Sequence, residues 1–218
     1  MSTLNTLNLQ IAFFFKEDFS KSFEWVSLKV QEEFGPNPSV NYIPLDNSAP
    51  NDLPRVEIIY NTFRIQCAKN RIDLIMDSSP ENINLINKFN NIDLFSLGIN
   101  IRRVGLVRNY YLNAEIKKAN KLLNNDFSTI NLKEITLRIN HVTKVKDCDC
   151  NNIEQIDYSD SIDYTHNGSI QRLSGYIIRR DINTLNELTI ELVKDDRKTL
   201  IDEFMRLSEE FVLRSKLS

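Results

Sequence analysis

The chain has 218 residues, of which 41% are hydrophobic and 26% charged, so it is large enough to bury a core without disulfides or a structural metal. Its net charge of -3 provides no general attraction to nucleic acid, so binding of that kind would need a local basic patch. Three cysteines and the absence of a long apolar run favour a cytoplasmic protein over a disulfide-bonded secreted protein or a membrane protein.

The first half of the chain predicts alternating strands and helices. Apolar residues at helical spacing predict a helix over residues 19–34, with Trp25 and Leu28 in its buried stripe, and a second helix after Ser79-Pro80. The proline-rich segment 36–54 reads as a surface loop. Runs of β-branched and aromatic residues predict strands at Leu7–Phe15, Val56–Tyr60, Thr62–Cys67, Arg71–Met76 and Ile99–Leu112. With the middle runs read as a hairpin or meander, the order β-α-β-β-α-β predicts a ferredoxin-like lobe over residues 1–123.

The segment Ile99–Leu112 is the predicted centre of the fold. Its residues fit a half-buried pleated surface, and hydrophobic segments that could pair with it lie on both sides in the sequence. We expect an interior strand, with Gly105 marking a bulge or a close approach of another backbone.

The second half predicts an antiparallel meander with a C-terminal helix, over residues 124–218 and tightly packed on the first lobe. A short helix in Asn113–Leu123 precedes the boundary at Asn124. The predicted strands are Ile135–Val145, Ile153–Tyr164, Ile170–Arg180 and Leu185–Val193, with a hairpin turn at Asn167-Gly168. The helix over 196–216 places Leu200, Phe204, Leu207 and Phe211 on one stripe. The whole chain is therefore predicted to be of the α+β class.

Candidates for metal binding and catalysis are weak. Cys148 and Cys150 could bind zinc together with His141 or His166, but C-x-C lacks the usual ligand spacing, and an exposed turn explains these cysteines better. His141 falls on the apolar face of its strand, which favours a core or rim histidine over a general base. The acidic series Asp157, Asp160 and Asp163 lacks the glycine and the closing glutamate of a calcium loop, so a solvated acidic edge is the better interpretation. No metal and no cofactor is expected.

Arginines on the predicted strands give the main candidate binding surface. If these strands shared an open surface, arginine and tyrosine would form a patch suited to a protein interface or to single-stranded nucleic acid. The competing interpretation is scattered surface charges paired with acidic residues. The candidates are Arg102, Arg103, Arg108, Tyr110, Arg179 and Arg180, with Arg64, Arg71 and Arg138 on other strand-like runs.

The stretch Arg103-Val104-Gly105-Leu106 resembles the central Arg-Ile-Gly-Leu-Arg-Tyr strand of a sporadically distributed family of uncharacterised bacterial proteins of similar length. Val107 intrudes before Arg108, and Tyr110 comes one position late. The segments 180–183 and 201–204 are similar to the closing region of that family. The resemblance implies no activity.

These observations favour a non-enzymatic bacterial or phage accessory protein that binds another protein, with a homodimer as one possible form. Binding of nucleic acid through the strand arginines is the first alternative. A hydrolase that uses scattered carboxylates or His141 is the second. No attachment to a membrane is expected.

Overall fold

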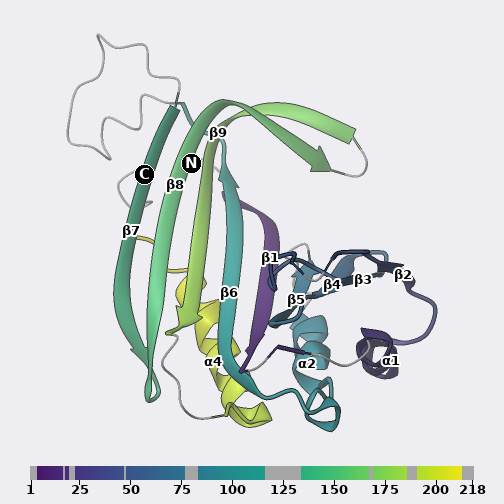
Figure 1. The fold of residues 1–218 in the computed structure, drawn as a ribbon. Helices are drawn as coiled ribbons and strands as arrows, with labels where there is room; N and C mark the ends of the chain where they lie inside the picture. The colour runs from purple at the N-terminus through teal and green to yellow at the C-terminus, as the bar shows by residue number, and fades with distance from the viewer. Residues whose placement is uncertain are drawn as a thin grey trace.

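In a computed structural model of the chain, the strands form one nine-stranded antiparallel sheet, shown in Figure 1. The structure describes residues 4–16, 18–19, 23–46, 48–76, 83–115, 134–166, 169–185 and 191–212, with backbone alone at 163–166, 169–171 and 173. The strand order is β2-β3-β4-β5-β1-β6-β9-β8-β7. None of the helices in these ranges has the length and apolar character that crossing a bilayer requires.

Strands and helices are interspersed along the chain. The strands are β1 (Leu4–Phe15), β2 (Ser39–Tyr42), β3 (Val56–Ile59), β4 (Phe63–Cys67), β5 (Arg71–Met76), β6 (Ile101–Leu112), β7 (Glu134–Val145), β8 (Cys148–His166) and β9 (Ser169–Thr184). The helices are α1 (Phe23–Phe34), α2 (Ile83–Asn91) and α4 (Lys194–Ser208), with a 3₁₀ turn η2 (Phe95–Leu97) closed by Gly98 at a φ of 73°.

The prediction of a ferredoxin-like lobe is wrong, although the prediction of the α+β class is confirmed. Four strands rather than two lie between α1 and α2. The three middle runs form a meander of β3, β4 and β5, and the segment expected to be a loop contains β2, which pairs with β3. The sheet also does not stop at β6, since β6 pairs with β9 along Gly105–Leu112. A single sheet therefore runs through both halves of the chain, instead of a ferredoxin-like unit followed by a separate meander.

Several expected features fall outside the described residues. They are the start of the second helix at Ser79-Pro80-Glu81, the helix in Asn113–Leu123 beyond Glu115, the boundary at Asn124, the turn at Asn167-Gly168, most of the strand Leu185–Val193 and the part of the predicted C-terminal helix after Val212. The C-terminal helix α4 already ends at Ser208, so its predicted continuation through Phe211 is wrong.

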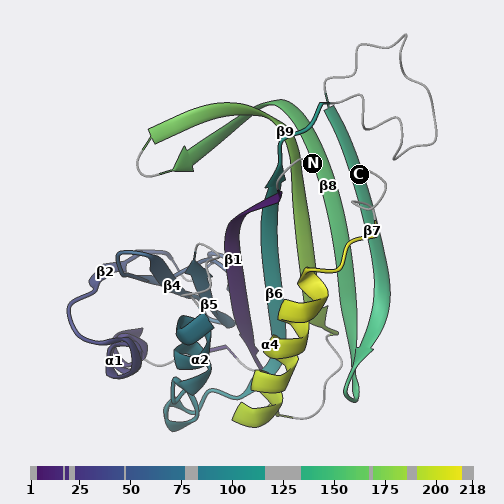
Figure 2. The same ribbon diagram turned by 180° about the vertical axis from the view of Figure 1, so that it is seen from behind.

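One face of the sheet is covered by helices, and the other face, here called the uncovered face, is covered by no helix of the described residues. Side chains alternate between the faces of a strand, so the register assigns each residue to a face. Leu9, Ile11 and Phe13 of β1 point toward the helices and are almost completely buried, whereas Gln10, Ala12 and Phe14 point the other way. Seen from behind in Figure 2, α2 and α4 lie in front of the sheet, and Figure 1 shows the opposite face of β6–β9 with α4 behind it. Val26 and Val30 of α1 are buried in the same core cluster.

The hydrophobic core lies between the sheet and the helices. Phe13 of β1 stacks on Phe89 of α2 at 4.6 Å between ring centroids, and Phe204 of α4 is completely buried in the same cluster. The predicted stripe of the first helix is only partly correct. Trp25 and Leu28 are more than half exposed, because the buried side of α1 is narrow and runs through Val26, Ser27 and Val30.

The prediction that Ile99–Leu112 forms an interior strand is confirmed by β6, which lies between β1 and β9. Gly105 does not mark a bulge. It pairs with Ala12 inside a regular stretch, and the register shifts between β1 and β6 fall at Thr6/Asn8 and Phe14/Phe15. Phe14 and Asn183 lie close over Gly105, at 3.4 and 3.5 Å from the position that a β-carbon would occupy there.

Candidate binding surface

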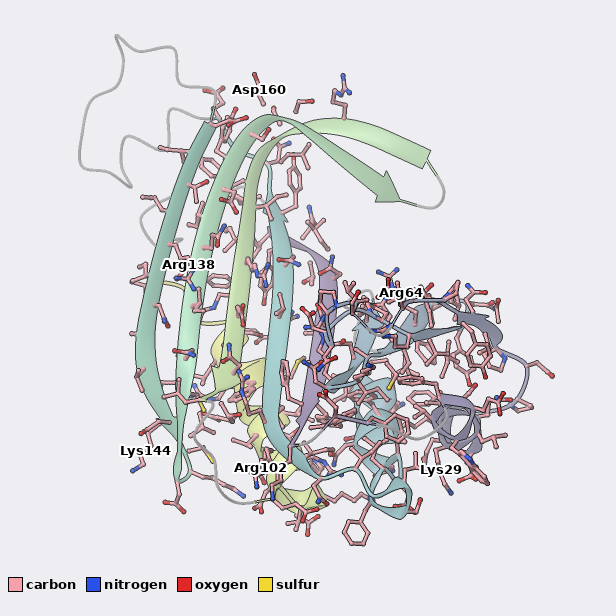
Figure 3. All side chains as sticks on the ribbon, viewed as in Figure 1. Lys29, Arg64, Arg102, Arg138, Lys144 and Asp160 are labelled. Atoms are coloured by element: carbon pink, nitrogen blue, oxygen red, sulfur yellow. The ribbon has the colours of Figure 1, made fainter. Side chains whose placement is uncertain are left out.

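The predicted binding residues divide between the two faces of the sheet. The register places Arg108, Tyr110 and Arg180 on the helix-covered face, and Arg103 and Arg179 on the uncovered face. Arg102 is the extra residue at the shift between Phe14 and Phe15, and Figure 3 shows it at the foot of β6. The structure therefore does not bring these residues together in a single patch.

Arg180 is the centre of a buried polar cluster under the C-terminal end of α4. Its guanidinium donates to Asn152 Oδ1 at 2.6 Å, to the carbonyl oxygen of Leu207 at 3.2 Å and to Glu154 Oε2 at 3.4 Å. Both charged side chains are 2% exposed, and burial lowers the pKa of Arg180 while Glu154 opposes that shift. The same Glu154 oxygen accepts the backbone N–H of Val212 at 2.7 Å. This arginine therefore joins β9 to the last turn of α4.

Arg108 and Tyr110 hold the same end of α4 from β6. Arg108 Nη1 donates to Glu209 at 3.0 Å and to the Ser208 hydroxyl at 3.4 Å, and the hydroxyl of Tyr110 donates to the carbonyl oxygen of Ser208 at 3.0 Å. Cations and donors are favourable at a helix C-terminus, where carbonyl oxygens lack partners within the helix. Arg108, Tyr110 and Arg180 thus attach the C-terminal end of α4 to the sheet.

Arg103 and Arg179 lie on the uncovered face and make local contacts there. Arg103 stacks over the ring of Phe14 at 4.6 Å and donates to the carbonyl oxygen of Thr184 at 3.0 Å. Burial lowers the pKa of Arg103, and Asp181 opposes that shift. Arg179 lies 3.3 Å from Asp181 and remains about half exposed at its side chain.

A network of amide side chains crosses the uncovered face between these arginines. Asn109 donates to Asn8 at 2.8 Å from β6 to β1, and Asn151 donates to Asn183 at 3.3 Å from β8 to β9. Gln155 and Thr136 both donate to the carboxylate of Asp157, at 2.9 and 2.8 Å. The sequence signal for this network is limited to polar residues at some alternate positions of a strand, such as Asn8 and Gln10 of β1, which in a chain rich in asparagine also fits simple compositional bias.

The arginines of β4 and β5 extend the uncovered face toward β2. Arg64 lies 3.4 Å from Glu57, beside a hollow of about 430 Å³ whose lining includes Asn8, Tyr60 and Ile75. Figure 3 shows Arg64 and Arg138 far apart over different parts of the sheet. The exposed cations are thus spread over the face, and no described ones gather around a single point.

Asp73 is the most deeply buried acid on the uncovered face. It is 1% exposed, accepts a hydrogen bond from Gln10 at 3.0 Å and lies 3.0 Å from Arg71 Nε. Burial raises the pKa of the Asp73 carboxyl, and the charge of Arg71 and the Gln10 hydrogen bond only partly offset that effect. The folded protein therefore holds a proton on Asp73 more tightly than the unfolded chain does.

We expect the Asp73→Asn substitution to remove a pH-dependent part of the stability. A carboxyl with a raised pKa in the folded state favours folding below its unfolded value of 3.8, and that contribution is lost as the pH rises through the folded pKa. The unfolding free energy of the wild type, relative to Asp73→Asn, should therefore fall with rising pH. Urea denaturation at intervals between about pH 4 and 8 measures this difference. A difference that stays constant or grows with pH would contradict the prediction.

The metal and catalytic candidates Cys148, Cys150 and His141 lie on the same face of two paired strands but differ in burial. Cys148 opens β8 and is half-buried, whereas Cys150 is completely buried, so the predicted exposed turn is wrong for Cys150. Burial raises the pKa of the Cys150 thiol to about 12, because the apolar surroundings disfavour a thiolate. His141 is exposed on β7, on the side of the sheet that faces the helices. Within the described ranges, no three His, Cys, Asp or Glu side chains are grouped so that they could hold a metal ion.

The acidic series is also divided. Asp157 lies within the amide network of the uncovered face, and Asp160 is exposed at the register shift of β8 between Ser159 and Ile162. The side chain of Asp163 is outside the described part of the chain.

A second cleft, of about 480 Å³, lies beside the ends of α2 and α4. Arg197 lines it, but its guanidinium already donates to Asn90 Oδ1 at 3.2 Å, to the Asn90 carbonyl oxygen at 3.3 Å and to the Leu192 carbonyl oxygen at 3.0 Å. These contacts tie α2 to the start of α4, so the arginine serves the fold.

Neither a family model nor a curated protein sequence matches this chain.

Proposed function

We propose that the chain is a non-enzymatic binding protein that recognises another protein across the uncovered face of its sheet. The observation that supports this proposal is the chemistry of that face. It carries hydrogen-bonding amides, hydroxyls and locally paired charges, together with partly exposed apolar residues such as Val107 and Ile177. Protein interfaces also combine polar groups of this kind with apolar contacts.

Pairing of the charges favours a protein partner over nucleic acid. Arg64, Arg71 and Arg179 each lie within 3.4 Å of a carboxylate on the same face. Binding to a nucleic-acid backbone requires cations that are free to neutralise phosphates, and an adjacent carboxylate repels the phosphate. The arginines Arg108 and Arg180, which the nucleic-acid alternative needs, are engaged with α4.

The test compares partner retention by matched variants of the full chain. Tagged wild-type protein is purified from its host, retained proteins are identified by mass spectrometry, and the complex is rebuilt from purified components. We expect the rebuilt complex to be lost in the double variant Arg64→Glu/Arg179→Glu, which changes two exposed side chains at opposite sides of the uncovered face. Lys198→Glu, an equally exposed charge reversal on α4, is the control and should retain the partner.

Two outcomes would overturn the proposal. One is that the double variant binds the partner as tightly as the wild type does. The other is that the wild-type chain retains no protein. Gel-shift assays with single- and double-stranded probes address the alternative. A salt-dependent shift abolished by replacing Arg102 and Arg103 would support nucleic-acid binding instead.

A further inference from the structure

Strand β7 forms a long, regular edge of the sheet. It pairs with β8 from Glu134 to Val145 without a register shift, and no strand in the described part of the chain pairs with its other side. The opposite edge, β2, has only four residues. Proteins usually protect sheet edges with short strands, prolines, bulges or charged side chains. β7 has no proline or bulge, and its charged residues Glu134, Arg138 and Lys144 all lie on the uncovered face. Its unpaired backbone groups are therefore a template for another strand.

The helix side of β7 is also incompletely covered. Ile135, Leu137 and Ile139 are only half-buried, and they pack against the cluster that contains Ile156 and Ile178. Helix α4 packs on β6 and β9, away from this edge, as Figure 2 shows. A strand added at β7 would extend this apolar layer and bury the remaining surface of the three side chains.

We infer that this edge pairs with β7 of a second copy of the chain, antiparallel and about a twofold axis at Ile139. Two copies related by a twofold axis place the same strand opposite itself. The uncovered faces of the two copies lie on the same side of the joined sheet only if odd-numbered residues lie opposite odd-numbered ones and even opposite even. A shift of one residue would turn every side chain to the other face. With Ile139 opposite Ile139, the faces match and nearly the whole strand is paired.

The charges of β7 fit this register. Glu134 of each copy lies opposite Lys144 of the other, and both belong to the uncovered face. Within the described residues neither side chain has an ion partner in its own chain. Oppositely charged side chains directly across two strands attract, and like charges repel. A shift of two residues in one direction would place Arg138 opposite itself, and a shift in the other direction would place Glu134 opposite Lys146, which lies beyond the end of β7 in the turn to β8.

This inference goes beyond the proposed function, because it concerns the edge of the sheet rather than its uncovered face. A monomer could still bind a partner across that face. In the dimer, the uncovered faces of the two copies would lie next to each other on the same side of the joined sheet. Each dimer would therefore present two equivalent binding faces.

A charge swap tests both the dimer and its register. The mass of the full chain is measured by size exclusion with light scattering, and the dissociation constant by sedimentation at a series of concentrations. We expect a dimer for the wild type. Glu134→Lys and Lys144→Glu should each weaken it about tenfold, since each places two like-charged pairs across the interface. The double variant Glu134→Lys/Lys144→Glu should restore the wild-type constant, and Lys198→Glu on α4 should leave it unchanged.

A central substitution provides the second measurement. Ile139→Asp places two carboxylates opposite each other on the axis and should give a monomer, with circular dichroism confirming that the variant remains folded. A wild-type chain that is monomeric at every concentration overturns the inference. So does a dimer whose constant is unaffected by the single charge reversals, or is not restored by the double variant. Retention of a protein partner is measured in a separate experiment, so the test of the uncovered face remains valid even if the chain is monomeric.

Discussion

The Gly175→Ala substitution should lower the free energy of unfolding by about 3 kcal/mol. Gly175 lies on β9 with a φ of 155°, opposite Ser159 and next to the register shift of β8 between Ser159 and Ile162. Figure 3 labels Asp160, which belongs to this shift, where β8 and β9 bend. A β-carbon there would be 2.6 Å from the carbonyl oxygen of Leu112 and 3.0 Å from the ring of Tyr111. Because the first contact is with backbone, β6 and β9 would have to separate to relieve it. Urea denaturation measures the loss.

Gly105→Ala is the matched control on the neighbouring strand. Its β-carbon would lie 3.4 Å from Phe14 and 3.5 Å from Asn183, both side-chain contacts, and the nearest backbone atom, the carbonyl oxygen of Ile182, is 4.0 Å away. A glycine inside a strand also costs about 0.5–1 kcal/mol relative to alanine, so the substitution should change stability by less than about 1 kcal/mol in either direction. Equal losses for the two variants would contradict the explanation based on the Leu112 carbonyl.

Local sequence patterns predicted most of the strands, but they did not predict the sheet order. β3, β4 and β5 follow directly from short runs of β-branched residues, and each pairs with its neighbour in sequence. β2 was missed because Ser39–Tyr42 has no buried face, and its signal is its pairing with β3. The pairing of β6 with β9 joins residues about 70 positions apart, and no local pattern encodes such a contact.

The division of the arginines between two faces could have been predicted only in part. Alternation along a strand is enough by itself to separate Arg103 from Arg108, and Arg179 from Arg180. It does not show which face a helix covers. Tyr110, Arg108 and Arg180 interrupt the apolar face of their strands, and that interruption indicates a specific buried partner. The partner, the C-terminal end of α4, lies in the last fifth of the chain and could not be identified from spacing.

The second large effect on stability is expected when the buried ion pair between Arg180 and Glu154 is broken. Arg180→Met should lower the free energy of unfolding by roughly 3–5 kcal/mol, because it leaves the carboxylate of Glu154 buried without its cation. The carbonyl oxygen of Leu207 and Asn152 Oδ1 lose their donor in the same variant. The last turn of α4 should then detach more readily, which limited proteolysis near Val212 can detect alongside urea denaturation.

The double variant Arg180→Met/Glu154→Leu separates a lost attraction from an uncompensated charge. Replacing both partners removes the buried carboxylate, so much of the stability lost in Arg180→Met should return, even though Val212 loses its hydrogen bond to Glu154. Arg179→Met is the adjacent control. It breaks an exposed pair with Asp181 on the uncovered face and should change stability by less than about 1 kcal/mol. If the Arg180→Met and Arg179→Met losses were alike, the cluster would not hold α4 to the sheet, and Arg180 would have to be explained by another role.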